Sequence, residues 1–415
     1  MADVQPLRAL HYDLATAGPL ADLVAPPYDV IDAEQRAALA ARSPHNVVEI
    51  DLPTGEDRYA TAARLFADWQ ASGVLVRDPE PALWALEQRY RGPDGQLNTR
   101  RGFFARVRVE EYGRGRIRPH ERTHPGPRED RLRLTRATRA NLSPIFALYS
   151  DPASVATAAL APAMNGAPWG EVTDADGTLH RVWRCSEPAA IEQVQAALEG
   201  AELLIADGHH RYETARIYAE EVGGEGDHRY VLMCLVALED PGLTVFPTHR
   251  LVRGLDATRR AALAAVIERD FLTVPVARGQ AAPPPGGGPL ELGYLDAERA
   301  MRLTLRDQAI ADAALADMPP AYRQLDTGTL EALLLKGALG VTDEDISHLH
   351  DFGYARDAEQ ALALIDSGEY EIAFLMRPTP VEQVREIAAA GVNMPPKSTY
   401  FFPKLLTGLV FNPLA

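Results

Sequence analysis

Residues 203–216 read Leu-Leu-Ile-Ala-Asp-Gly-His-His-Arg-Tyr-Glu-Thr-Ala-Arg, and the rest of the chain is best interpreted outward from this stretch. The apolar run from Leu203 to Ala206 predicts a buried strand, Gly208 allows a tight turn, and a helix is expected to begin near His209. The free N–H groups and the positive dipole end of that helix would then lie at the carboxyl end of the strand. Such a corner favours binding of an anion.

The side chains at this corner strengthen that interpretation. His209, His210 and Arg211 offer hydrogen-bond donors, and an arginine can bind phosphate through two parallel bonds. Asp207 is suited either to hold Mg²⁺ or to accept a proton. The plainer alternative is that Asp207 caps the helix and both histidines lie on the surface. Four polar side chains on one turn exceed what capping requires.

Strand and helix patterns continue on both sides of this corner, and they predict an α/β fold with mixed sheets. Residues 46–52 are predicted to form a short strand, and helices are expected over 33–41, 59–71, 188–198 and 211–222. The run from Pro283 to Gly288 favours a loop or linker. We expect an α/β domain over 1–150 with a basic loop at 114–141, a second over 151–280 that contains the corner, and a C-terminal α/β segment over 289–415.

Composition excludes several classes of protein. The 415 residues include 42 Lys and Arg against 58 Asp and Glu, a formal charge of −16, which disfavours general nucleic-acid binding. Cys185 and Cys234 are the only cysteines, which argues against a disulfide scaffold and a thiolate zinc site. No stretch approaches the roughly 20 apolar residues of a membrane helix, and the first residues lack a secretory pattern. We therefore expect a soluble, cytoplasmic protein with no membrane partner.

A second signal lies in residues 118–127, Arg-Pro-His-Glu-Arg-Thr-His-Pro-Gly-Pro. Its prolines stiffen a loop that carries an acid, bases and cations together, which is typical of a site. Glu121 is a candidate general base or metal ligand, and Arg122 and Thr123 are candidate phosphate contacts. The alternative is an exposed surface loop. Arginines follow at 128, 131, 133, 136 and 139 and suggest an anionic ligand, while Ser143 is a further candidate polar contact.

A third signal lies near the C-terminus, in residues 393–410. Lys397, Ser398 and Thr399 resemble the end of a phosphate-binding loop, but the glycines that would cradle phosphates are missing. Lys397 and Lys404 flank hydroxyls and aromatic side chains within an acidic chain, which suits a phosphate or an aromatic base. The alternative is an ordered segment that packs its aromatic residues into the core.

Four motifs, in this order, resemble the DUF1015 family of bacterial and archaeal proteins. They are Ala25–Ile31, His120–Thr123, Ala206–Tyr212 and Met394–Thr399. The Asp-Gly-His-His-Arg turn is also similar to the nucleotide-binding turn of the ParB/sulfiredoxin-like superfamily, which includes CTP-hydrolysing partition proteins, sulfiredoxin and free-serine kinases.

That second resemblance implies a ParB/sulfiredoxin-like core. It also implies that nucleotide phosphates bind at Gly208, His209, His210 and Arg211, with a metal or base role for Asp207. The acidic charge and the lack of a helix-turn-helix pattern disfavour the partition proteins. The lack of a cysteine in the turn disfavours sulfiredoxin. A small-molecule kinase is the branch that remains.

We therefore expect a phosphotransferase that uses a nucleoside di- or triphosphate, ATP or ADP, with Mg²⁺ and a small hydroxyl acceptor such as free serine. The Asp207 turn, the His120 loop and the Lys397 loop are predicted to line one cleft. The expected base is Glu121, with Asp207 as Mg²⁺ ligand or alternative base, and the phosphate contacts are His209, His210, Arg211, Lys397 and Lys404. A phosphate-ester or nucleotide hydrolase and a non-enzymatic nucleotide-sensing protein are the alternatives; the oligomeric state is not predicted.

Overall fold

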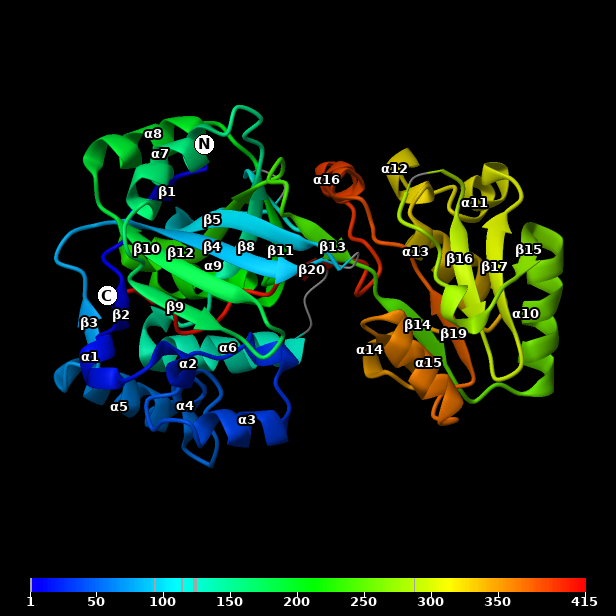
Figure 1. Ribbon diagram of the computed structural model, residues 1–415, viewed down its shortest axis with the longest axis horizontal. Helices are drawn as coiled ribbons and strands as arrows, with labels where there is room; N and C mark the ends of the chain where they lie inside the picture. The colour runs from blue at the N-terminus through cyan, green and yellow to red at the C-terminus, as the bar shows by residue number, and fades with distance from the viewer. Residues whose placement is uncertain (1, 93–94, 113–114, 122–124, 287) are drawn as a thin grey trace. The chain divides into compact units, whose positions relative to one another are not determined.

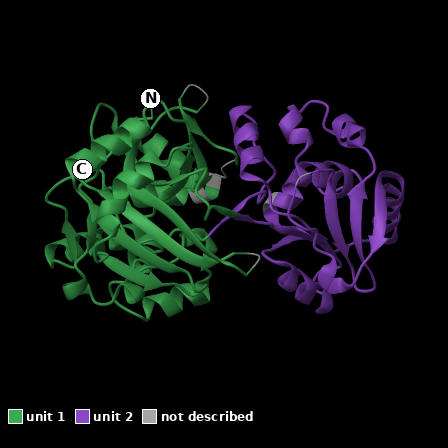
Figure 2. Cartoon of the chain, turned by 45° about the horizontal axis from the view of Figure 1, so that its top comes forward, with its two compact units in different colours: residues 1–244, 403–415 green, residues 245–402 purple. Residues whose placement is uncertain are grey.

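The computed structural model describes residues 2–92, 95–112, 115–121, 125–286 and 288–415. It forms two compact units, residues 1–244 with 403–415 (unit 1) and residues 245–402 (unit 2), as Figure 2 shows. The three segments expected from the sequence divide the chain differently. Unit 1 continues through residue 150 because strand β8 (Ile145–Tyr149) pairs with two strands that follow it, β11 (Leu203–Asp207) and β12 (Tyr230–Ala237).

Unit 1 is built on a nine-stranded sheet with the order β6-β11-β8-β12-β5-β4-β10-β9, and β1 pairs with β5. Pairs β8–β12 and β6–β11 are parallel and the others are antiparallel, so the sheet is mixed, as expected for the fold class. Its other strands are β1 (Val4–Gln5), β4 (Leu83–Arg91), β5 (Leu97–Arg108), β6 (Ile117–Arg118), β9 (Gly170–Thr173) and β10 (Leu179–Cys185). Two small ribbons pair β2 (Leu10–Tyr12) with β3 (Leu75–Arg77) and β7 (Ala140–Asn141) with β21 (Asn412–Pro413).

Helices cover both faces of this sheet (Figure 1). On one face, alternate β5 residues such as Phe103 and Val107 pack in one core cluster with Ile191 and Val194 of α8. A second cluster joins the N-terminal helices to α6 and to the C-terminal Phe411. The helices of unit 1 are α1 (Leu14–Ala17), α2 (Leu20–Leu23), α3 (Ala33–Ala40), α4 (Val48–Asp51), α5 (Arg58–Ala71), α6 (Pro125–Thr138), α7 (Val155–Met164), α8 (Pro188–Ala197) and α9 (His209–Val222), with 3-10 turns Tyr28–Val30 and Asp227–Arg229.

Unit 2 contains a six-stranded sheet with the order β15-β17-β16-β19-β14-β18. Its strands are β14 (His249–Val252), β15 (Phe271–Pro275), β16 (Glu291–Leu295), β17 (Ala300–Leu305), β18 (Phe352–Ala355) and β19 (Ile372–Leu375); β13 (Thr244–Phe246) and β20 (Tyr400–Phe402) form a separate pair. The helices are α10 (Ala257–Asp270), α11 (Gln308–Ala314), α12 (Pro320–Arg323), α13 (Asp326–Leu330), α14 (Asp343–His348), α15 (Ala358–Asp366) and α16 (Val381–Ala389), with a 3-10 turn Arg278–Gln280 and a π-helical turn Glu331–Lys336.

Two of the structural predictions for unit 1 are wrong. Residues 114–141, expected to form a basic loop, contain the 14-residue helix α6, because Leu132 and Leu134 of this polar segment are buried in hydrophobic clusters. Residues 46–52, expected to form a strand, contain helix α4 instead. The side chain of Asn46 accepts a hydrogen bond from the Val48 N–H at 3.1 Å, and this local bond starts the helix. Val47, Val48 and Ile50 are all buried, so tertiary packing outweighs the strand preference of β-branched residues.

Candidate functional site

The strand, turn and helix predicted at residues 203–216 are present. Strand β11 ends at Asp207 and the 14-residue helix α9 begins at His209. A register shift against β8 between Ile205 and Asp207 re-aims the end of the strand. Gly208 has φ +98°, a conformation that favours glycine, and its carbonyl accepts the Tyr212 N–H at 3.0 Å. We call the group Asp207, Gly208, His209, Arg211 and Lys404 the Asp207 corner.

Two cations meet the carboxylate of Asp207. Arg211 Nη2 lies 3.0 Å from Oδ2, and Lys404 Nζ lies 3.3 Å from Oδ1. Burial alone would raise the pKa of Asp207, but Lys404 and Arg211 outweigh it and hold that pKa well below its usual range. The corner therefore holds an ionised carboxylate between two positive charges at neutral pH.

Arg211 is fixed in place by hydrogen bonds to two neighbours. Its guanidinium donates to the Pro144 carbonyl and to Asp207, and its side chain is 9% exposed. A Cβ on residue 208 would lie 3.0 Å from Arg211 Nε, so the glycine also leaves room for the guanidinium. The turn thus presents one oriented cation beside the first N–H groups of α9.

The structure brings the second predicted loop to this corner through two histidines. The backbone N–H of His120 donates to His209 Nε2 at 3.2 Å, and His120 Nδ1 donates to the Ile205 carbonyl at 2.8 Å. The two rings meet edge to face with centroids 4.7 Å apart. Burial lowers the pKa of His120 to about 4 and lowers the pKa of His209 well below its ordinary value. At neutral pH, His209 therefore supplies a neutral ring whose Nε2 accepts a hydrogen bond, and it brings no positive charge to a phosphate.

The remaining residues of the two motifs have these positions. Glu121 directly follows the anchored His120 and is partly exposed, and His210 is partly exposed in the first turn of α9. Arg122 and Thr123 lie outside the described residues.

Lys397, Ser398 and Thr399 belong to unit 2, so their place in the same cleft stays a prediction. Ser398 is buried, donates to the Pro395 carbonyl at 2.7 Å and shares a 2.8 Å hydrogen bond with Thr327. Lys397 is exposed, and its φ of +57° lies in the left-handed region. Of the predicted C-terminal residues, Lys404 is the one that the structure places at the corner.

The arginine run predicted to bind an anion is largely neutralised by carboxylates. Helix α6 carries most of the run. Arg133 binds Glu129 on the preceding turn at 2.9 Å, and Arg136 binds Glu221 of α9 at 2.5 Å. Arg131 is buried and pairs with two aspartates. The carboxylates come partly from other helices, which the one-dimensional pattern did not reveal.

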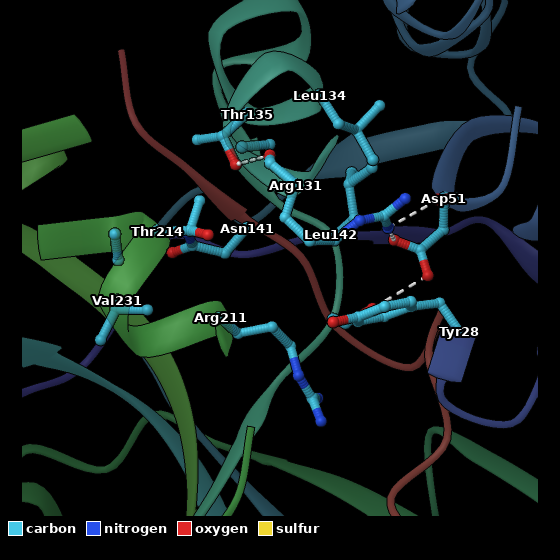
Figure 3. A pocket seen from close by; sticks show the side chains of 13 residues that line it. Tyr28, Asp51, Arg131, Leu134, Thr135, Asn141, Leu142, Arg211, Thr214 and Val231 are labelled. Atoms are coloured by element: carbon cyan, nitrogen blue, oxygen red, sulfur yellow. Dashed lines mark hydrogen bonds and ion pairs between the residues drawn. The ribbon is translucent and has the colours of Figure 1, made fainter. Parts of the chain in front are cut away.

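Sequence reasoning missed one polar cavity of about 40 Å³, which Figure 3 shows. We call it the Asp51 pocket, and its polar lining consists of Tyr28, Asp51, Arg131, Ser143, Arg211 and Thr214, with Thr135 and Asn141 beside them. Ser143, a candidate contact from the sequence, donates to Asp51 Oδ2 at 3.1 Å. Two signals were available: Asp51 interrupts an apolar run, and Tyr28 lies in the Ala25–Ile31 motif.

A metal site independent of phosphate finds no support in the part of the chain that the structure describes. It contains no group of three or more His, Cys, Asp or Glu side chains placed to hold a metal ion. Asp207 offers a single carboxylate already bound by Arg211 and Lys404. Mg²⁺ at this place would therefore take most of its ligands from phosphate oxygens and water, as is usual for that ion.

A family model described as "Protein of unknown function (DUF1015)" matches residues 4–328. The chain belongs to this family. The match contains three of the four motifs quoted above, those at Ala25–Ile31, His120–Thr123 and Ala206–Tyr212, and ends before Met394. No curated protein matches the sequence.

Among solved structures, this DUF1015 chain has distant matches. A conserved hypothetical protein from Pyrococcus furiosus is 14% identical with a TM-score of 0.35, covering 69% of this chain and 87% of that one. A free serine kinase in complex with AMP is 13% identical with a TM-score of 0.35, covering 69% and 83%. C-terminally truncated SbnI from Staphylococcus aureus is 10% identical with a TM-score of 0.37, covering 73% and 85%.

Within the described residues, no helix combines the length and the apolar character needed to span a bilayer.

Proposed function

We propose that this DUF1015 protein is a nucleotide-dependent phosphotransferase that transfers a phosphoryl group from ATP or ADP to the hydroxyl of a small metabolite such as free serine. The observation that carries the proposal is the Asp207 corner. The partly buried carboxylate of Asp207 orients Arg211 and Lys404 beside the N-terminus of a 14-residue helix. Partly buried ionisable groups whose pKa values are strongly shifted by specific charge partners are candidates for functional sites.

The corner has the chemistry that phosphoryl transfer requires. Catalysis of this reaction rests on positioning and on neutralising charge that spreads over the phosphoryl oxygens. The backbone N–H groups of the first turn of α9, with Arg211 and Lys404, supply that positive potential. His120 and His209 are neutral, so their role is to anchor the loop that leads to Glu121.

Glu121 is the proposed base for the acceptor hydroxyl. It directly follows His120, whose backbone is tied to His209 at the start of α9. A positioned carboxylate contributes typically 10²–10⁴-fold to such a step. Mg²⁺, bound with the nucleotide phosphates, would supply further charge neutralisation.

The test measures product formation by the full-length protein with ATP or ADP and Mg²⁺, with and without L-serine. We expect nucleotide consumption that depends on the acceptor, and a loss of about 10²-fold or more in kcat for Glu121→Gln. Glu192→Gln, an exposed change on α8, is the matched control and should leave kcat unchanged.

Two other outcomes would each contradict the proposal. Nucleotide or phosphate-ester cleavage that is independent of acceptor would identify a hydrolase. Nucleotide binding seen by calorimetry without turnover, with Glu121→Gln behaving like the unaltered protein, would identify a sensing protein.

A further inference from the structure

The Asp51 pocket contains a buried hydroxyl that no described residue satisfies. Thr214 is 3% exposed, and its Oγ1 has no hydrogen-bond partner in the described part of the chain. Thr214 lines the pocket from helix α9. A buried polar atom without a partner is rare in folded proteins and calls for an explanation, of which a bound polar group is one.

The pocket also contains a buried ion pair whose carboxylate has unused hydrogen-bond acceptor sites. Arg131 Nη1 donates to Asp51 Oδ1 at 3.2 Å, and its Nε and Nη2 bind Asp130 at 3.0 and 2.6 Å. Arg58 also binds Asp130, at 3.0 Å, so two guanidiniums face these two carboxylates. Burial raises the pKa of the Asp51 carboxyl, and the charge of Arg131 opposes that effect. Each oxygen of Asp51 has one side-chain donor in these contacts, and a carboxylate has about four acceptor sites, so Asp51 retains spare acceptor capacity.

The shape and chemistry of the pocket limit what it can hold. About 40 Å³ accommodates roughly three water-sized groups at 10–15 Å³ each. Oxygens of Asp51, Thr214 and Tyr28 offer hydrogen-bond acceptors around this space. The guanidinium carbon of Arg131 lies 4.3 Å from the centroid of the Tyr28 ring. The guanidinium of Arg211 points away from the pocket in Figure 3, toward its bonds with Asp207 and Pro144. The lining thus favours a small cation with several N–H donors.

We propose that the Asp51 pocket binds the protonated amino group of the phosphate acceptor, which makes the acceptor a small amino alcohol or hydroxy amino acid. An ammonium group has three donors and no acceptor, which matches Asp51, Thr214 and Tyr28. Arg211 lines this pocket with its stem and holds Asp207 with its guanidinium, so one residue connects the acceptor and phosphate sides. That the bound amine is the phosphate acceptor rests on the proposed phosphotransferase function. That the pocket binds an amine does not depend on that function.

The experiment separates the two claims by measuring binding and turnover independently on the full-length protein. Thermal shift and calorimetry use L-serine and ethanolamine, which carry an amine, against glycerate and ethylene glycol, which do not. L-Alanine is an amine without a hydroxyl, so it reports binding where no transfer can occur. We expect the three amines to bind and the two other compounds not to bind.

Thr214→Val is the decisive variant because it removes a hydroxyl that has no partner among the described residues and so should not impair folding. We expect at least a tenfold weaker Kd for L-serine and L-alanine, a matching rise in the KM for L-serine, and unchanged nucleotide affinity. Thr178→Val is the matched control, since Thr178 Oγ1 is also buried without a partner in the described chain but does not line the pocket. Thr214→Ser should restore binding.

Each outcome bears on one claim. Amine binding that Thr214→Val weakens, without acceptor-dependent nucleotide consumption, would support the pocket and overturn the phosphotransferase. Two results would overturn the amine pocket and leave the phosphotransferase standing. The first is acceptor-dependent turnover that is as efficient with glycerate as with L-serine. The second is acceptor-dependent turnover in which Thr214→Val behaves like Thr178→Val.

Discussion

The Asp207 corner and the Lys397 segment looked alike in the sequence, since both combine a cation with short polar side chains, but the fold uses them differently. At the corner, a carboxylate and two cations from segments about 200 residues apart are drawn together, with side chains 9–21% exposed. In the Lys397 segment, the hydroxyl of Ser398 is used by Pro395 and Thr327, while Lys397 is exposed. Polar groups whose bonds close within one unit's framework stabilise it, whereas partly buried charges joined from distant segments are candidates for chemistry.

Removing the carboxylate of the corner should give the largest effect on stability. Asp207→Asn leaves Arg211 and Lys404 close together without their counter-charge, and breaking such a pair costs about 3 kcal/mol of unfolding free energy. Urea denaturation at pH 7 measures it. Glu220→Gln is the control. It breaks the ion pair between Arg216 and Glu220, whose side chain is 53% exposed, and should cost less than about 1 kcal/mol of unfolding free energy. Equal costs for the two variants would contradict the view that the corner is special.

The pH dependence of stability tests the neutral histidines of the corner. The pKa of His120 is about 4 in the folded protein, below the ordinary value of 6.5, so between these values the unfolded chain binds more protons. Stability should therefore fall as the pH drops from 6.5 toward 4, by up to about 1.4 kcal/mol per pH unit for this one group. Asn can replace the Nδ1–H donor but does not titrate.

His120→Asn should therefore make the unfolding free energy less dependent on pH between 6.5 and 4. The imidazole is neutral at pH 7.5, so the unfolding free energy of each protein is compared with its own value at that pH. Urea midpoints between pH 4.5 and 7.5 provide the measurement. A variant profile as steep as that of the unaltered protein would show that His120 is not held neutral by burial.

Glycine substitutions separate backbone strain from crowding at the corner. Gly208→Ala forces a side chain into φ +98° and places its Cβ 3.0 Å from Arg211 Nε. Gly223→Ala, at the other end of α9, meets no atom within 4 Å, but its φ of +69° and ψ of 171° lie in a region that is essentially restricted to glycine. We expect each variant to cost about 1–3 kcal/mol, Gly223→Ala through backbone strain alone, with a weaker nucleotide affinity for Gly208→Ala alone. Equal nucleotide affinities for the two variants would remove Arg211 from the explanation.

The sequence anticipated the corner because its signal is local. An apolar strand, a glycine and a polar helix start lie within 14 residues, and the structure follows them closely. It could not anticipate the charge state of His209, which depends on burial beside His120, 89 positions away. The Asp51 pocket was missed for the same reason, since its lining comes from segments as distant as Tyr28 and Thr214. The neutralisation of the arginine run likewise depends on Glu221, which lies on another helix.

The smallest expected change in stability is at Lys397. This residue sits at φ +57°, where a side chain costs roughly 1 kcal/mol and glycine does not, although glycine also gains entropy in the unfolded chain. Lys397→Gly should therefore raise stability by only about 0.5 kcal/mol relative to Lys397→Ala, as measured by chemical denaturation. If Lys397 also contacts nucleotide phosphate, as predicted, both variants should weaken nucleotide affinity by the same factor, because strain kept at a lysine is typical of a functional site. Unchanged affinity in both would instead leave Lys397 as a turn residue and confine the phosphate site to Arg211 and Lys404 of unit 1.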